Sequence, residues 1–364
     1  MLNNLLPLAP FHGGEGHGST THHPITLDSS PVPTLPNLSC LLPFASASAP
    51  ACQALGAQLH TPHLNTLLAE LTRVHTDTGT DHDFSLPHER ALARQVCLLA
   101  ADGQPLGDGL LPWAAWASAQ QQTISHTAAD LPQAWFTPCH FQVGMEQVTL
   151  LSADQLVLSE AESRALFDAL APFCAEDGIQ LRFDHATRWH ASGPPLRGLV
   201  CASLDRVTGR PVDAWLTHST HQGHAQLIKR LQSEAQMLFY THPVNDAREA
   251  ARQPTLNGLW IHGAGALPGP LPAVPPPHMP DALRTAALRD DWAAWQAAWA
   301  ALDAELMAPL LAAARQGEAV SLTLCGERNA QQWVSRPRQG LARLRHWIHT
   351  RRSPAPAWNV LQTL

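Results

Sequence analysis

The spacing of apolar and polar residues changes several times along the chain and divides it into four stretches. Residues 1–40 show no hydrophobic period and are rich in Pro, His, Gly, Ser and Thr, so we expect a flexible leader. The apolar run at 39–47, where the leader ends, predicts a short buried strand, and helical spacing follows it within residues 41–134. We therefore interpret 41–134 as the first part of a folded core.

Residues 135–222 have a different pattern. Short runs of alternating apolar and polar residues predict strands, and one segment predicts a helix. Ser159 precedes this helix and can cap its free N–H groups, while Glu160 and Glu162 lie near the positive end of the helix dipole. This stretch predicts a compact α/β subdomain.

Residues 223–364 return to longer elements. The predicted elements are a helix at 225–240, a buried strand at 256–265 that enters a glycine turn, a helix at 282–315 with Trp292, Trp295 and Trp299 on one face, and a strand at 321–327. Helices and buried strands thus alternate on both sides of the 135–222 stretch. We predict an α/β protein whose parallel-sheet core, 41–134 and 223–364, is interrupted by an inserted subdomain.

Composition narrows the classes of function. With 23 Lys+Arg against 30 Asp+Glu the formal charge is −7, which disfavours nucleic-acid binding through bulk charge. Lys229 is the only lysine, which excludes a P-loop mechanism. The seven cysteines include no CxxC pair, so we expect neither disulfides nor a thiolate zinc site. The sequence has no long uninterrupted apolar stretch and no basic secretory start, so we expect a cytoplasmic protein that binds no membrane.

The richest polar cluster is the segment 241–250, which contains His242, Asn245, Asp246 and Arg248. A guanidinium with a nearby amide and imidazole suits a phosphate or carboxylate ligand, and ligands settle at strand ends of open α/β sheets. The structural alternative is that Asn245 and Asp246 cap a turn while Arg248 pairs with a carboxylate. Both interpretations stay open at this stage.

Other chemistry-bearing residues are less concentrated. Cys139 and His140 are neighbours on a predicted strand and point to opposite faces, so they form no dyad, although His140 can reach a neighbouring site. Arg206 and Arg210 lie near Asp205 and Asp213 in the sequence, and these opposite charges can pair with one another. The 21 histidines include a triplet at three-residue steps, 218, 221 and 224, but no carboxylate follows at a recognised spacing, and we expect no metal site.

Four strings resemble a bacterial family of RpfE-type regulatory proteins, also described as phosphoglycerate-mutase-like. They are LPHERALAR (86–94), TPCHFQVGMEQVTLL (137–151), ASLDRVTGRPVDAWL (202–216) and QMLFYTHPVNDAREA (236–250). The resemblance runs from about Cys40 to the C-terminus.

A weaker similarity links the chain to archaeal-type cofactor-independent phosphoglycerate mutases of the alkaline phosphatase superfamily. It rests on Asn245, Arg248, Asn257, Trp260, Gly263 and Gly265, and on an insert similar to 143–188. This resemblance implies an alkaline-phosphatase-like core with an inserted α/β subdomain. It also implies two metal ions held by Asp and His, and a Ser or Thr nucleophile. Here the first strand, LLPFASA, ends without a carboxylate, and the last, LTLCGERNAQQW, offers Glu327 but no Asp–His pair.

We therefore expect a regulatory or small-anion-binding protein without two-metal catalysis and without a cofactor. The expected ligand is a small phosphorylated metabolite, and the candidate site residues are His242, Asn245, Arg248, Asn257, His140 and Arg206. One alternative is an active phosphoglycerate mutase or metal-dependent phosphatase that takes Mn or Zn through atypical ligands. A second alternative is an interaction module whose insert binds a protein partner.

Overall fold

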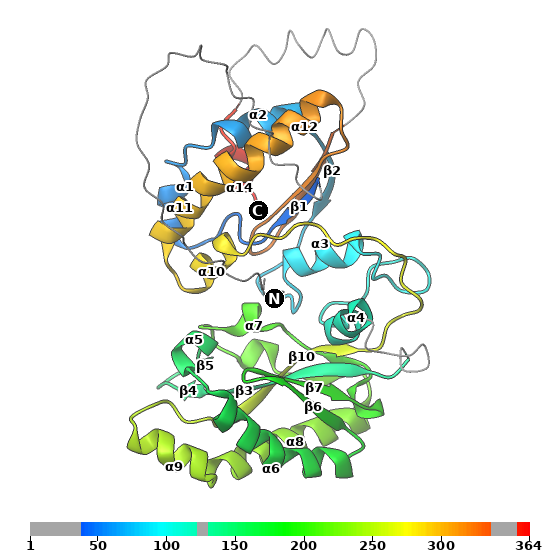
Figure 1. Cartoon of the computed structure of the whole chain (residues 1–364), viewed down its shortest axis with the longest axis vertical. Coiled ribbons are helices and arrows are strands. Elements are labelled where there is room, and N and C mark those ends of the chain that lie inside the picture. Colours follow the sequence, from blue (N-terminus) through cyan, green and yellow to red (C-terminus); the bar gives the residue numbers. More distant parts are fainter. Residues whose placement is uncertain (1–37, 122–129, 336–354) are drawn as a thin grey trace, which may run out of the picture. The chain divides into compact units, whose positions relative to one another are not determined.

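The computed structural model describes residues 38–121, 130–335 and 355–364, and every structural statement below concerns these residues. Most of the predicted leader, residues 1–37, lies outside them. The described residues form an α/β protein with two four-stranded sheets and two short two-stranded sheets (Figure 1).

The first sheet has the strand order β1-β11-β12-β2. Its strands are β1 (Ser39–Leu42), β11 (Ser321–Cys325), β12 (Ala330–Val334) and β2 (Thr72–Asp77). Only β1 and β11 are parallel; β12 is antiparallel to both of its neighbours. The predicted parallel core is therefore wrong for this sheet, because the four residues between β11 and β12 can only turn the chain back on itself.

Helices cover both faces of the first sheet. Cys40 and Leu42 point into the larger core cluster, whereas Leu41 points to the other face and contacts α3, as expected for a strand period of two. The helices are α1 (Pro50–Gly56), α2 (Pro62–Glu70), α3 (Pro87–Gln95), α10 (Ala282–Leu288), α11 (Trp292–Leu302), the π-helical η4 (Asp303–Met307), α12 (Ala308–Gln316) and α14 (Trp358–Leu361).

The predicted tryptophan stripe is confirmed as core packing. Trp295 and Trp299 are both 0% exposed, and Trp292 packs against the same cluster. The predicted single helix over 282–315 is interrupted, because Asp290 has a positive φ of 53° and Asp291 caps α11 by accepting a hydrogen bond from Ala294 N–H.

One continuous helical run among the described residues, Trp292–Gln316, is long and apolar enough to cross a membrane by length and composition alone. Of its most apolar window, 39% is buried inside the structure. A helix of a protein core meets the same criterion, and Trp295 and Trp299 place this one in the core.

The second sheet is antiparallel throughout, with the order β10-β3-β7-β6. Its strands are β3 (Gln133–Cys139), β6 (Gln180–His185), β7 (Arg188–Ser192) and β10 (Gly258–Gly265). Thus β10, which follows the predicted 135–222 insert in sequence, pairs with β3 from inside it. A buried strand looks alike in parallel and antiparallel sheets, so the sequence pattern did not reveal this pairing.

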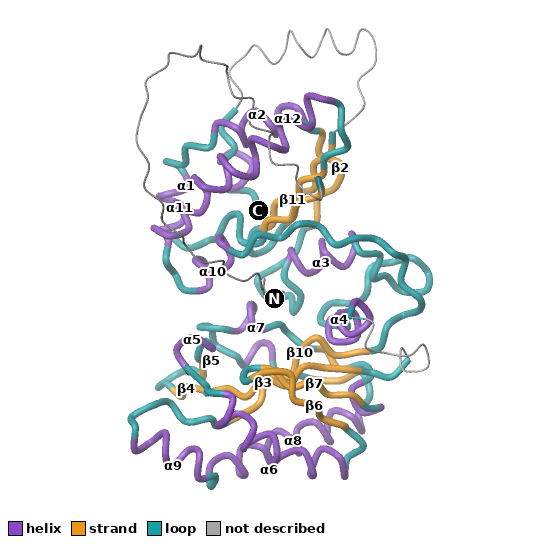
Figure 2. The backbone as a smooth tube through the Cα atoms, in the orientation of Figure 1, coloured by secondary structure: helices purple, strands orange, loops and turns teal. Residues whose placement is uncertain are grey.

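Helices pack on both faces of the second sheet: α6 (Glu160–Glu176) and α8 (Gln222–Tyr240) on one, and α4 (Trp113–Gln120) on the other (Figures 1 and 2). The predicted cap of α6 is confirmed, because Ser159 Oγ accepts from Glu162 N–H while Glu162 Oε2 accepts from Ser159 N–H. The remaining elements are β4 (Phe141–Val143), β5 (Val148–Leu150), α5 (Ala153–Leu156), η2 (Pro194–Leu196), β8 (Leu199–Val200), α7 (Leu204–Val207), η3 (Asp213–Trp215), β9 (His218–Ser219) and α9 (Pro243–Ala250).

His262 in β10 makes the stability of the fold depend on pH. It is 8% exposed, its Nε2 lies 3.1 Å from Thr137 Oγ1, and burial lowers its pKa from 6.5 to about 4. Between these pH values the unfolded chain binds a proton at His262 that the folded chain does not, so stability falls as pH falls through this window. At pH 5 the loss from this group is about 2 kcal/mol.

Urea denaturation at pH 7.5 and pH 5 tests this dependence on the protein and on its His262→Gln variant. Between pH 7.5 and pH 5, the unfolding free energy is expected to drop by about 2 kcal/mol less in the variant than in the unaltered protein. Equal drops in both proteins would show that His262 titrates normally.

Candidate functional site

Arg248 and Asn245, the centre of the predicted anion site, are fully engaged with the protein. Arg248 is 1% exposed; its Nε donates to Pro254 O (2.7 Å), its Nη1 to Glu162 Oε1 (2.9 Å) and its Nη2 to Leu156 O (2.6 Å). Asn245 Nδ2 donates to two backbone carbonyls, and its Oδ1 accepts from Leu256 N–H. The pairing of Arg248 with a carboxylate is the part of the structural alternative that these contacts bear out, and together they tie α9 to the chain around it.

The neighbouring candidate residues, His242, Asn257 and His140, also contact backbone groups of the protein. His242 Nδ1 accepts from Val244 N–H at the start of α9. Asn257 bonds Phe141 through both its amide oxygen and its amide nitrogen, at 2.7 and 2.9 Å, and His140 Nδ1 lies 2.6 Å from Thr255 O. The structure thus places these residues at α9 and near the junction between β3 and β10, whereas Arg206 lies on α7.

Arg206 differs from Arg248 in one decisive respect. It is also 1% exposed, yet its Nε, Nη1 and Nη2 have no hydrogen-bond partner among the described residues. Its guanidinium carbon lies 5.9 Å from the centre of the Trp215 ring. Burial lowers the pKa of Arg206, repulsion from Arg210 lowers it further, and attraction to Glu89 opposes both. A buried cation without hydrogen bonds is unfavourable unless something else compensates its charge.

The acidic groups near Arg206 are occupied by other partners. Asp205 is paired with Arg284 through both carboxylate oxygens, and His88 Nε2 lies 3.5 Å from it. Burial alone would raise the pKa of Asp205, but His88 and Arg284 hold it well below its usual range. Glu89 and Asp83 attract Arg206 but make no hydrogen bond to it. The positive charge of Arg206 is therefore balanced within the described residues without a direct ion pair.

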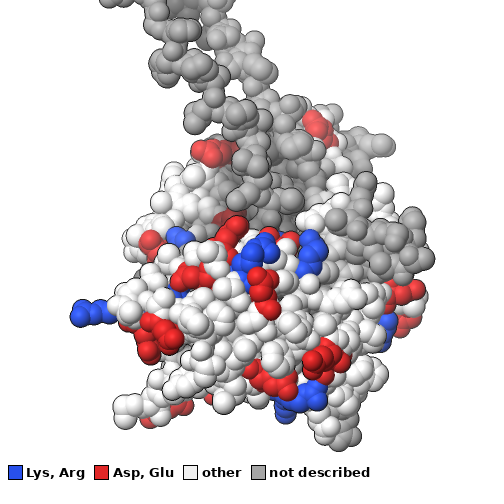
Figure 3. Space-filling view, turned by 60° about the horizontal axis from the view of Figure 1, so that its bottom comes forward, with Lys and Arg blue, Asp and Glu red and all other residues white. Residues whose placement is uncertain are grey.

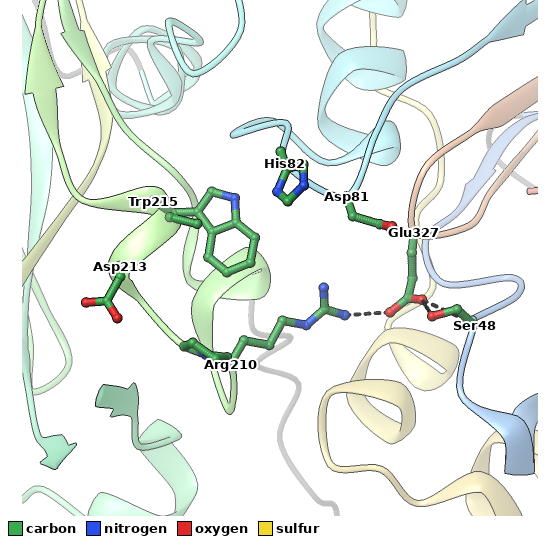
Figure 4. A pocket seen from close by; sticks show the side chains of 9 residues that line it. Ser48, Asp81, His82, Arg210, Asp213, Trp215 and Glu327 are labelled. Atoms are coloured by element: carbon green, nitrogen blue, oxygen red, sulfur yellow. Dashed lines mark hydrogen bonds and ion pairs between the residues drawn. The ribbon is translucent and has the colours of Figure 1, made fainter. Parts of the chain in front are cut away.

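A pocket of about 460 Å³ is lined by Trp215, the residue whose ring lies next to Arg206 (Figure 4). Its lining residues are Ser48, Asp81, His82, Arg210, Pro211, Asp213, Ala214, Trp215 and Glu327. In Figure 4, Trp215, His82 and Arg210 surround the open centre, and Arg210 reaches across to Glu327. Trp215 therefore lines the pocket with the same ring that contacts Arg206, and its own Nε1 has no partner among the described residues.

Local backbone features hold Arg210 and Trp215 in place. Thr208 and Pro211 form bridges to Leu150 and Thr149 of β5, so the turn between them is fixed at both ends. Gly209 has a φ of 72°, a conformation that favours glycine, and it places Arg210 at the turn. The 3-10 turn η3 then carries Trp215.

Glu327 and Ser48 close the pocket on the side opposite Trp215. Arg210 Nη2 donates to Glu327 Oε1 (2.5 Å), and Glu327 Oε2 accepts from Ser48 N–H (2.7 Å) and from the Ser48 hydroxyl (2.5 Å). The suggestion that Arg206 and Arg210 pair with the neighbouring aspartates is wrong, since Arg210 pairs with Glu327 and Asp205 with Arg284.

Arg210 lines the pocket, and Arg206 lies behind its aromatic wall, Trp215. Three carboxylates line the pocket as well, of which Glu327 pairs with Arg210 and Asp81 with Arg328, while Asp213 is the third. Guanidinium groups beside an aromatic ring can bind an anionic ligand. Within the described residues, no group of three or more His, Cys, Asp or Glu side chains is placed to hold a metal ion. On the face displayed in Figure 3, acidic and basic side chains are intermixed.

The chain is similar to known proteins in structure, but no family model or curated protein matches its sequence. Among solved structures, it is similar to a cofactor-independent phosphoglycerate mutase from Thermoplasma acidophilum DSM 1728 (12% identity, TM-score 0.32, 81% of this chain and 89% of that chain). It is also similar to the PH0037 protein from Pyrococcus horikoshii (12% identity, TM-score 0.43, 82% of this chain and 87% of that chain). The resemblance to RpfE-type proteins has no counterpart among these findings and stays a prediction.

Proposed function

We propose that this protein binds a small phosphorylated metabolite in the Trp215 pocket and acts as a regulatory binding protein. The observation that carries the proposal is the buried, unpaired guanidinium of Arg206 behind the pocket wall. An oxyanion at Arg210 would receive the field of both arginines, and this attraction is stronger beside a protein wall than in bulk water. The proposal moves the candidate site from Arg248 to Arg206 and Arg210.

The donor set does not fit the two metal ions that a phosphoglycerate mutase of the alkaline phosphatase type would need. The carboxylates and imidazoles of the described residues do not gather into a group that would hold one ion. Glu327, the acidic residue after β11, is already held by Ser48 and Arg210. We therefore derive no catalytic step through metal.

Isothermal titration with inorganic phosphate and with 3-phosphoglycerate tests the proposal. Replacing Arg206 with glutamine is expected to weaken binding at least roughly tenfold, because one of the two positive charges is lost. The matched control is Arg315→Gln, a surface arginine with a side chain 57% exposed, which should bind as the unaltered protein does.

Two results would contradict this function. One is equal heats, or none, from the unaltered protein and Arg206→Gln. The other is stoichiometric Mn or Zn in protein purified without an affinity tag, together with mutase or phosphatase activity that a chelator abolishes.

A further inference from the structure

We propose that Glu327 is a built-in competitor for the anion position at Arg210, and that the pocket therefore accepts dianionic phosphoryl groups and rejects carboxylates. This inference rests on the proposed function and specifies its ligand class. Glu327 already places a carboxylate oxygen 2.5 Å from Arg210 Nη2, in the position that a bound oxyanion would take.

The position of Glu327 is well supported. Its second carboxylate oxygen accepts two hydrogen bonds from Ser48, and its side chain is only 14% exposed. Burial raises its pKa, but the bonds from Ser48 and the charge of Arg210 more than offset this, so the carboxylate stays ionised. A ligand must displace a fixed negative charge to reach both Nη groups of Arg210.

The balance of charge decides which ligand can do so. A ligand carboxylate brings one negative charge, equal to that of Glu327, and it also loses its freedom of motion on binding. A phosphoryl group carries about −1.5 to −2 at neutral pH and presents three acceptor oxygens. Arg206 adds a second positive charge behind the pocket wall, 5.9 Å from the centre of the Trp215 ring, and a dianion gains more from this charge than a carboxylate does.

The rest of the pocket has room for the body of such a ligand. Its volume of about 460 Å³ lies within the usual range for small-molecule sites. Trp215 and His82 border the open centre beside Arg210 (Figure 4). A phosphomonoester bound at Arg210 would lie with its carbon portion against these two rings.

Titration of inorganic phosphate and of acetate at about pH 8, where phosphate is mainly dianionic, tests the inference. The unaltered protein is expected to bind phosphate and to give no measurable heat with acetate. Glu327→Gln keeps the shape of the side chain but removes its charge, so phosphate should bind roughly tenfold tighter and acetate binding should become measurable. Glu318→Gln, at an exposed position, is the matched control.

Each outcome separates this inference from the proposed function. If phosphate binding depends on Arg206 but Glu327→Gln binds phosphate no more tightly, the competitor role is overturned and the proposed function stands. Acetate binding to the unaltered protein as tightly as phosphate also overturns it. If neither the unaltered protein nor Glu327→Gln binds phosphate, both proposals fail. Thermal unfolding of Glu327→Gln checks that the variant is folded.

Discussion

Replacing Arg248 with methionine is expected to lower the free energy of unfolding by about 4 kcal/mol. The substitution removes an ion-pair partner from Glu162, which has a side chain 26% exposed, and leaves the carbonyl groups of Leu156 and Pro254 without their donors. Leu156 is only 2% exposed, so water cannot replace the donor that its carbonyl loses, and an unpaired buried acceptor is unfavourable. Equilibrium denaturation in urea measures the loss.

The matched control is Arg206→Met, since both arginines are 1% exposed. Arg206 has no hydrogen bond to lose, so an apolar side chain of similar length is expected to change the unfolding free energy by less than about 1 kcal/mol or to raise it. Equal, large losses from both substitutions would show that Arg206 is a structural residue, and the site would lose its main support.

This contrast also shows where sequence reasoning reached its limit. Residue types made Arg248 attractive as an anion ligand, but its role is fixed by Glu162, 86 positions earlier in the chain. Arg206 was among the candidates, yet it has no hydrogen-bond partner among the described residues, and the adjacent Asp205 pairs with Arg284, 79 positions further along the chain. Such choices of partner depend on three-dimensional packing and leave no local pattern.

Local features were predictable for the opposite reason. The Ser159 cap involves residues three apart, and the tryptophan stripe follows from helical spacing within α11. The direction of the strands was not predictable from local sequence. β10 pairs antiparallel with β3, although more than a hundred residues separate the two strands in the chain. Distant pairing likewise brings Ser48 to Glu327, 279 positions away, and no motif in the sequence marks them.

Replacing Trp295 with alanine is expected to cost about 4 kcal/mol of unfolding free energy, one of the two largest effects that we predict. The indole is 0% exposed, so its removal leaves a cavity in the main core. Its Nε1–H also donates to the carbonyl of Phe44 (2.9 Å), a residue held at a positive φ of 52°. Without that donor, Phe44 loses a hydrogen bond that holds it in a backbone conformation that residues other than glycine rarely adopt.

Two further variants separate these causes. Trp295→Phe keeps much of the volume but lacks the donor, and should lose about 1–2 kcal/mol. Trp292→Ala, on the same helix but only half-buried, should lose less than Trp295→Ala. The consequence extends toward the site, because the Phe44 ring lies 5.7 Å from that of His88, which contacts Asp205 beside Arg206. If Trp295→Ala is no less stable than Trp292→Ala, the core does not hold Phe44 in this way.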